Sequence, residues 1–212
     1  MQWTLVVPLK PLARAKSRLA DTADDGLRPD LALAFAQDTV AAALACPAVG
    51  DVAVVTDDAR AGRELAALGA AIIADEPGGG LNAALAHATR VVRSTRPARA
   101  VAALNADLPA LRPVELSRVL DAAAEFPRAF LPDAAAIGTT LLAAAPGRAL
   151  RPAFGSDSRA RHRASGAVEL LLTAVDSVRQ DVDTGDDLRS ALALGVGPHT
   201  AAAVARLLIP GQ

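Results

Sequence analysis

Short runs of β-branched residues alternate along the chain with longer stretches rich in Ala and Leu. Side chains repeat every two residues in a strand and about every 3.6 in a helix, so the two kinds of run can be told apart. These periods predict strands at 3–9, 51–56, 70–74 and 99–104 and helices at 30–46, 59–68, 81–94 and 113–124. Such an alternating order favours an α/β fold with a mostly parallel sheet and helices on both of its faces.

The pattern changes after Phe126, where two strand-like runs follow each other without a helix between them. For this part we expect strands at 129–132 and 138–144, a polar loop at 155–166, a helix at 168–174, an extended run at 178–182 and helices at 186–194 and 200–208. We find no repeat, linker or domain boundary and expect residues 1–212 to form one domain. The last helix has an apolar face that could dock on this domain or on a second copy, which leaves a homodimer open.

Composition narrows the class of protein. Hydrophobic residues make up 52% of the 212 residues and charged residues 21%, which excludes a disordered chain. With 22 basic and 23 acidic residues the net charge is −1, so we expect neither a nucleic-acid partner nor a membrane partner. One cysteine excludes a disulfide framework. The strand-like start, without a signal segment, leads us to expect the cytoplasm.

Basic residues cluster directly after the first predicted strand. In open parallel sheets, ligands bind beyond the carboxyl ends of the strands. Four cations fall within nine residues there, and Lys10, Lys16 and Arg18 could converge on a polyphosphate through charge-assisted hydrogen bonds. The alternative is a solvated basic turn.

A glycine-rich turn, Gly78-Gly79-Gly80-Leu81-Asn82, follows the third predicted strand and opens a helix. Glycines let the backbone approach an anionic or flat ligand closely. The turn matches neither the phosphate loop of P-loop proteins nor the dinucleotide fingerprint, which argues against both classes. The Asn82 amide suits a nucleobase edge, and a role at the start of the helix is equally physical.

Two acidic groups end apolar runs. Asp107 closes the fourth strand, and Asp181 and Asp183 lie in an extended pattern whose alternation would put both on one side. Carboxylates at strand ends are natural ligands for Mg²⁺, so the three could share a metal ion. A single aspartate in a loop is more commonly a helix cap or a surface charge, and that reading stays open.

The remaining polar segment, residues 154–166, carries Ser, Arg and Gly groups that could hold a phosphate or carboxylate. His162 could serve there as a base or a pH switch, or be an ordinary histidine in a solvated loop. Thr139 and Thr140 add hydroxyls after Gly138, although threonine pairs are common in strands. No GxSxG elbow is present, which disfavours a serine hydrolase.

Five segments of the chain, taken in order, resemble the guanylyltransferases of coenzyme F(420) biosynthesis. They are VPLKPLARAKSRL, GGGLNAAL, NADLPAL, FGSDSRARHRASGA and DVDTGDDL. That family includes phosphoenolpyruvate guanylyltransferases of actinobacteria and 2-phospho-L-lactate guanylyltransferases of archaea. The resemblance runs from about Val7 to Leu188. Two departures are Gly185, where the family pattern has Pro, and a richer arginine content at 157–163. The first could loosen a turn near the metal.

The resemblance implies a nucleotidyltransferase fold of the glycosyltransferase-A kind, with GTP as co-substrate, Mg²⁺ as cofactor and a small phospho-acid as acceptor. Residue by residue, it implies that Lys10, Lys16 and Arg18 hold the GTP phosphates and that Gly80 and Asn82 face the guanosine. It also implies that Asp107, Asp181 and Asp183 bind the metal ion. The acceptor would be received by Thr140, Gly155 and Ser158. Lys10, Lys16, Arg18 and Asp107 would be the catalytic groups.

In the implied reaction, an oxygen of the acceptor phosphate attacks the α-phosphorus of GTP and pyrophosphate leaves. A phosphate monoester is already anionic at pH 7, so no strong base is required. We favour phosphoenolpyruvate as acceptor because the Ala- and Arg-rich composition looks actinobacterial, with 2-phospho-L-lactate as the alternative. Another Mg²⁺-dependent nucleotidyltransferase or a non-catalytic nucleotide-binding module also remains open, as does direct hand-over of the product to a following transferase.

Overall fold

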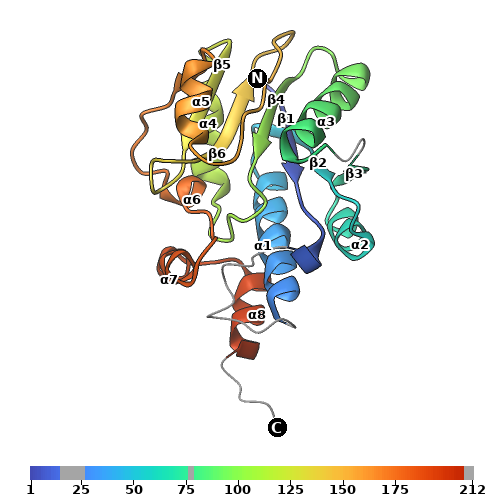
Figure 1. Ribbon diagram of the computed structural model, residues 1–212, viewed down its shortest axis with the longest axis vertical. Helices are drawn as coiled ribbons and strands as arrows, with labels where there is room; N and C mark the ends of the chain where they lie inside the picture. The colour runs from blue at the N-terminus through green and yellow to red at the C-terminus, as the bar shows by residue number, and fades with distance from the viewer. Residues whose placement is uncertain (15–26, 76–78, 208–212) are drawn as a thin grey trace.

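A computed structural model describes residues 1–14, 27–75 and 79–207. Its centre is a seven-stranded sheet in the order β3-β2-β1-β4-β6-β5-β7 (Figure 1). The strands are β1 Trp3–Pro8, β2 Val49–Val55, β3 Ala71–Ile73, β4 Ala100–Leu104, β5 Arg128–Pro132, β6 Thr139–Ala144 and β7 Val168–Glu169. The helices are η1 Leu12–Arg14, α1 Leu27–Leu44, α2 Ala59–Ala67, α3 Leu81–Thr95, α4 Pro113–Ala123, α5 Ser158–Ala164, α6 Asp176–Arg179, α7 Gly185–Leu194 and α8 Pro198–Leu207.

Most strand pairs are parallel, and β6 alone among these seven runs antiparallel to its neighbours β4 and β5. The reason is the short connection between β5 and β6, because a parallel pair requires a long crossover. The mostly parallel α/β sheet predicted from the sequence is confirmed. Because β6 is antiparallel, its first residues lie at the same edge of the sheet as the carboxyl ends of β1 and β4.

Each face of the sheet carries its own apolar core. Leu5, Ala102 and Leu131 belong to one face, which packs against α1, α2 and α4. Val6 and Phe130 belong to the other, which packs against α3 and the segment before α5. The strands are therefore buried on both faces, as their nearly continuous apolar sequences predict. Helices on both faces are confirmed.

The last helix, α8, packs on α1 at its lower end in Figure 1. The Asp38 carboxylate of α1, only 5% exposed, accepts hydrogen bonds from the backbone N–H groups of His199 (3.1 Å) and Thr200 (2.8 Å). These N–H groups open α8, so Asp38 satisfies donors that the helix itself leaves unpaired. Of the two docking surfaces considered for this helix, the structure shows the one on the same chain.

Three predictions for the last third were wrong. Residues 158–164 form α5 rather than part of a loop, and 168–174 begin with the edge strand β7 rather than a helix. The expected extended run at 178–182 instead starts within α6. In β7, Val168 pairs with Ala129 of β5, so a contact distant in sequence overrides the local helical pattern.

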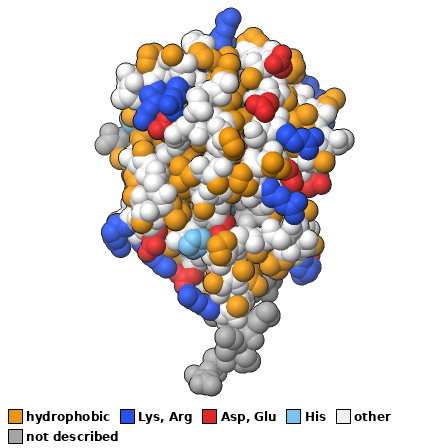
Figure 2. Space-filling view, turned by 180° about the vertical axis from the view of Figure 1, so that it is seen from behind, with side chains coloured by type: hydrophobic (Ala, Val, Ile, Leu, Met, Phe, Trp, Pro, Cys, Tyr) orange, Lys and Arg blue, Asp and Glu red, His pale blue; other side chains and the backbone are white. Residues whose placement is uncertain are grey.

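Two surface properties bear on partners. On the face seen in Figure 2, basic and acidic side chains are interspersed among apolar ones, in keeping with a net charge of −1. Within residues 1–14, 27–75 and 79–207, no helix has both the length and the apolar character to cross a bilayer.

Candidate active site

A cavity of about 710 Å³ opens at the edge of the sheet where β1 and β4 end and β6 begins. Its size is typical of a ligand pocket, and its position beyond the strand ends is where such sheets bind ligands. The described residues around it come from the strand ends, from α3, from the turn before β6, from the segment before α5 and from the segment before α7. They include Lys10, Asn105, Asp107, Asp133, Ile137, Gly138, Thr139, Gly155, Asp157, Ser158, Asp181 and Asp183.

Asp107, Asp181 and Asp183 all line this cavity, and their sharing of a metal ion stays a prediction. The backbone N–H of Val182 donates a 3.1 Å hydrogen bond to the Asp107 carbonyl oxygen, which ties the second acidic segment to the end of β4. Val182 is fully buried, and the two aspartates beside it reach the cavity wall. The Asn105 amide also donates to the Asp181 carboxylate, at 3.3 Å.

The turn after Asp183 is fixed by a capping box at the start of α7. The Thr184 hydroxyl accepts from the Asp187 N–H at 3.3 Å, while the Asp187 carboxylate accepts from the Asp183 and Thr184 N–H groups at 3.1 and 2.8 Å. These contacts satisfy donors at the helix start. The loosening that Gly185 suggested is therefore offset, because the turn is held by side chains on both sides of that residue.

The donor set around the cavity fits a hard divalent cation. Five of the described lining residues are aspartates and one is a lysine, so an anionic ligand in this cavity would need added positive charge. No three His, Cys, Asp or Glu side chains in the described part of the chain stand close enough together to form a ready-made metal cage. Mg²⁺ usually takes one or two carboxylates together with substrate phosphates and water, so an open carboxylate wall suits it.

Only one of the three basic residues predicted for the site lies in the described part of the chain. Lys10 is exposed, lies just after β1 and lines the cavity, where its ammonium can reach an anionic ligand. The predicted partners Lys16 and Arg18 lie outside the described residues. Convergence of the three cations on a polyphosphate therefore stays a prediction.

The two residues expected to face guanosine have different surroundings. Gly80 lies at the N-terminus of α3 with φ of +87°, a conformation that glycine adopts without strain, and lines a smaller neighbouring cavity. The Asn82 side chain instead bonds to the backbone of Phe154 twice. Its Nδ2 donates to the Phe154 carbonyl at 3.0 Å, and its Oδ1 accepts from the Phe154 N–H at 2.8 Å.

On the acceptor side, Gly155 and Ser158 line the cavity together with Asp157. Thr140 is fully buried and is not among the lining residues, whereas its neighbour Thr139 is. The pairing of β5 with β6 shifts by one residue here, so that Pro132 lies opposite Thr139. Such a bulge re-aims side chains beside a site. Both threonines are candidates from the sequence, but the spacing of residues alone does not locate the bulge that decides which one lines the cavity.

His162 is not a solvated loop residue, because its side chain is completely buried in α5. Its Nε2 accepts from the Ala153 N–H at 3.0 Å, so we assign the ring proton to Nδ1, which donates to the Thr139 hydroxyl at 2.9 Å. Burial, together with the charges of Arg128 and Arg161, lowers the pKa of His162 to about 4. The imidazole is therefore neutral at pH 7 and joins three segments beside the cavity.

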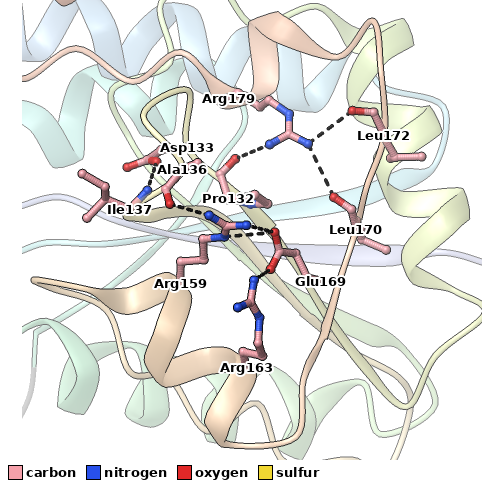
Figure 3. A network of polar contacts seen from close by, with 10 residues as sticks. All are labelled: Pro132, Asp133, Ala136, Ile137, Arg159, Arg163, Glu169, Leu170, Leu172 and Arg179. Atoms are coloured by element: carbon pink, nitrogen blue, oxygen red, sulfur yellow. Dashed lines mark hydrogen bonds and ion pairs between the residues drawn. The ribbon is translucent and has the colours of Figure 1, made fainter.

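Several arginines of the expected anion-binding segment are engaged with protein groups. Figure 3 shows Arg159 bonded to the Glu169 carboxylate and to the Ala136 carbonyl (2.8 Å), and Arg163 bonded to the same carboxylate. Burial acts to raise the pKa of Glu169, and the hydrogen bonds and charges of both arginines outweigh it and lower that pKa. The network holds the turn before β6, which contributes Ile137 to the cavity.

Asp133 shapes the same turn and was not singled out from the sequence. Its carboxylate accepts from the N–H groups of Ile137 (2.9 Å) and Gly138 (2.8 Å). A Cβ at Gly138 would lie 2.3 Å from an Asp133 oxygen, so this close approach requires glycine. The signal that could have found Asp133 is its position directly after a predicted strand, the same signal that found Asp107.

Comparison with known proteins agrees with this picture. Residues 3–209 match the family model described as "Guanylyl transferase CofC like". The chain is 84% identical, over all 212 residues of both chains, to the phosphoenolpyruvate guanylyltransferase of Streptomyces coelicolor. It is 58% identical to that of Thermomonospora curvata, with 98% of this chain and 90% of the relative covered.

Among solved structures, a nucleotidyl transferase from Methanothermobacter thermautotroptrophicus superposes with a TM-score of 0.64 at 23% identity, covering 91% of this chain and 97% of that one. A Mycobacterium tuberculosis protein solved as a complex with manganese has a TM-score of 0.55 at 22% identity, covering 91% and 99%. These likenesses show the nucleotidyltransferase-like fold. The match of nearly the whole chain to the family model, with relatives of high identity, establishes that it belongs to the CofC-like guanylyl transferase family.

Proposed function

We propose that this protein transfers the guanylyl group of GTP to phosphoenolpyruvate, giving enolpyruvyl-diphospho-5′-guanosine and pyrophosphate. The observation that carries the proposal is a single cavity lined by Asp107, Asp181 and Asp183 together with Gly155 and Ser158. The high identity to relatives named phosphoenolpyruvate guanylyltransferase supports the choice of acceptor.

Bond making and breaking follow from charge. A phosphate oxygen of the acceptor forms a bond to the α-phosphorus of GTP, and the bond from that phosphorus to the β-phosphate oxygen breaks. The leaving pyrophosphate keeps the electron pair. Because the attacking phosphate is already ionised, no side chain has to remove a proton. A neutral and buried His162, occupied by Thr139 and Ala153, is in keeping with a reaction that needs no base.

Positioning is the protein's main task, because two anions must be brought together. Lys10 would contact the GTP phosphates, joined by Lys16 and Arg18. Gly155 and Ser158 would receive the phospho-acid, with its phosphate near Ser158, and we retain Thr140 as a third contact on the strength of the family motif. Thr139, which lines the cavity, is an additional hydroxyl within the same wall.

We propose Mg²⁺ as the metal, held by carboxylates from the set Asp107, Asp181 and Asp183 together with substrate phosphates and water. When bound, it would neutralise phosphate charge and stabilise the negative charge that develops on the leaving group. The carboxylate wall of the cavity supports this assignment, as does a fold neighbour solved with manganese.

The experiment is a pyrophosphate-release assay with purified protein, GTP, Mg²⁺ and either phosphoenolpyruvate or 2-phospho-L-lactate, with a no-acceptor control. We expect release with phosphoenolpyruvate at a kcat/KM well above that for 2-phospho-L-lactate. Release with 2-phospho-L-lactate alone would move the assignment to the alternative acceptor. Release with neither, but with a sugar phosphate, would move it to another nucleotidyltransferase class.

A further inference from the structure

A second, smaller cavity of about 240 Å³ adjoins the main one. Four residues line both cavities and form the shared wall: Pro8, Leu9, Lys10 and Leu81. The rest of the smaller cavity comes from the ends of β2 and β3 and from the start of α3. Its position beyond the carboxyl ends of the strands makes it a ligand compartment of the same sheet edge.

Aliphatic side chains form much of the wall of this compartment, beside the charged residues Lys10 and Asp75. Pro8, Pro11, Val55, Leu81 and Ala84 contribute aliphatic surface, and Gly80 contributes backbone without a side chain. No Phe, Trp or Tyr side chain is among its described lining residues. Aliphatic walls around a small volume suit the two faces of a flat heterocycle, because burying its faces removes apolar surface from water.

Asp75 is the one carboxylate among the described lining residues of this compartment. Its Oδ1 has almost no accessible surface and accepts no hydrogen bond within the described part of the chain. Its backbone N–H donates to the Asp57 carboxylate at 2.9 Å, which fixes the residue two positions after the end of β3. A buried acceptor left without a hydrogen bond destabilises the fold, so it calls for a donor from elsewhere.

The chemistry of an ionised carboxylate selects the occupant. It can only accept hydrogen bonds, and its two oxygens accept best from two adjacent N–H groups. Guanine carries such a pair, N1–H and the 2-amino group, on its Watson–Crick edge. Adenine has an acceptor at N1 and no 2-amino group. Because Oδ1 has almost no accessible surface, such a pair of donors would meet it after the carboxylate rotates about its Cβ–Cγ bond, which is a broad torsion for aspartate.

We propose that Asp75 reads the Watson–Crick edge of guanine and is the residue that makes this site specific for GTP. The inference rests on the proposed function, because it places the base beside the cavity in which guanylyl transfer would occur. It also gives Lys10, in the wall between the two cavities, a place next to the nucleotide phosphates. Gly80 then allows close approach of the base, while recognition comes from a side chain.

The test is equilibrium binding of GTP, XTP, ITP and ATP to the wild-type chain and to Asp75→Asn, measured with Mg²⁺ and without an acceptor. An asparagine amide can accept from N1–H and donate to the 2-oxo group of xanthine, so Asp75→Asn should bind GTP more weakly and XTP more tightly than the wild type. We expect the ratio of GTP affinity to XTP affinity to fall by about a hundredfold or more in the variant. ITP, which lacks the 2-amino group, should bind the wild type about tenfold more weakly than GTP.

The matched control is Asp57→Asn, which removes the same charge nearby while keeping an oxygen for the Asp75 N–H. Its nucleotide preference should equal that of the wild type. An unchanged ratio of GTP affinity to XTP affinity in Asp75→Asn would overturn the inference. An equal loss of affinity for all four nucleotides would overturn it too. Failure of the proposed function shows differently, as absent guanylyl transfer to phosphoenolpyruvate in a protein that still prefers GTP.

Discussion

Asn82 and Phe154 are joined by two hydrogen bonds, in which the amide side chain at the start of α3 both donates to and accepts from the Phe154 backbone. Phe154 directly precedes Gly155, which lines the proposed acceptor site. The pair therefore connects the helix beside the proposed nucleotide compartment to the segment expected to hold the phospho-acid.

Replacing Asn82 should affect the acceptor more than the nucleotide. Asn82→Asp loses the donor to the Phe154 carbonyl and sets a charge against that oxygen. We expect the KM for phosphoenolpyruvate to rise about tenfold, in line with loss of a hydrogen bond worth roughly 1–1.5 kcal/mol. Steady-state kinetics with each substrate varied in turn would measure this, and Gln37→Ala, which removes an exposed contact on α1, is the control. A rise confined to the KM for GTP would instead favour direct contact of Asn82 with guanosine.

The carboxylates Asp107 and Asp183 should be essential for turnover. In Asp107→Asn and Asp183→Asn, we expect kcat to fall about 10³-fold or more, because transition-state charge would lose its metal-mediated stabilisation. Circular dichroism should show an unchanged fold, and Asp121→Asn, on the exposed side of α4, should keep normal kcat. Near-normal turnover in both variants would remove the metal assignment and favour a non-catalytic nucleotide-binding module.

His162 should govern acid stability and leave the pH dependence of catalysis unchanged. Its pKa is about 4 in the folded chain and about 6.5 when unfolded, so only the unfolded chain binds the proton between these values. Its contribution to stability is constant above pH 6.5 and falls by roughly 1.4 kcal/mol per pH unit down to pH 4. Urea unfolding at pH 7.5 and 5.0 should show that the free energy of unfolding falls more between these pH values for the wild type than for His162→Gln.

The same variant separates the catalytic roles considered for this histidine. If His162 is a positioning residue, kcat for His162→Gln should keep the wild-type pH profile between pH 6 and 8 while its magnitude falls. Loss of an inflection in that range would identify His162 as a base and contradict the neutral, buried imidazole that the structure shows.

Glu169 should act on the acceptor through the turn before β6. Glu169→Gln removes the charge shared by Arg159 and Arg163, and we expect a loss of about 1–3 kcal/mol of unfolding free energy. The KM for phosphoenolpyruvate should rise several-fold while the KM for GTP stays near the wild-type value. Asp186→Ala, which breaks an exposed ion pair with Arg189, is the control and should change neither quantity measurably. Equal changes in both KM values would argue against a role for this turn in acceptor binding.

Much of the first half of the fold could be predicted from the sequence. The strands β1, β2 and β4 are apolar runs buried on both faces, and such runs carry a strong local signal. Asp107 could be found for the same reason, because it lies three residues beyond the end of a clear strand. The glycine content of the turn before α3 likewise pointed to a residue, Gly80, that lines a cavity at this edge of the sheet.

The last third depends on contacts that local pattern does not contain. Val168 is in a strand because β5 offers it an edge, and His162 is buried because Phe154 and Phe130 pack against its ring. Asp181 and Asp183 were expected to share a side through strand alternation. They instead flank a buried Val182 in an irregular segment bonded to Asp107, and both line the cavity.

The measurement that tests the account most directly is a crystal structure of this protein with Mg²⁺, phosphoenolpyruvate and a non-hydrolysable GTP analogue. We predict Mg²⁺ at Asp107, Asp181 and Asp183, with the acceptor phosphate beside Ser158 and the α-phosphate of the nucleotide within reach of it. Mg²⁺ bound away from these three carboxylates, or phosphoenolpyruvate outside this cavity, would contradict the proposed catalytic site.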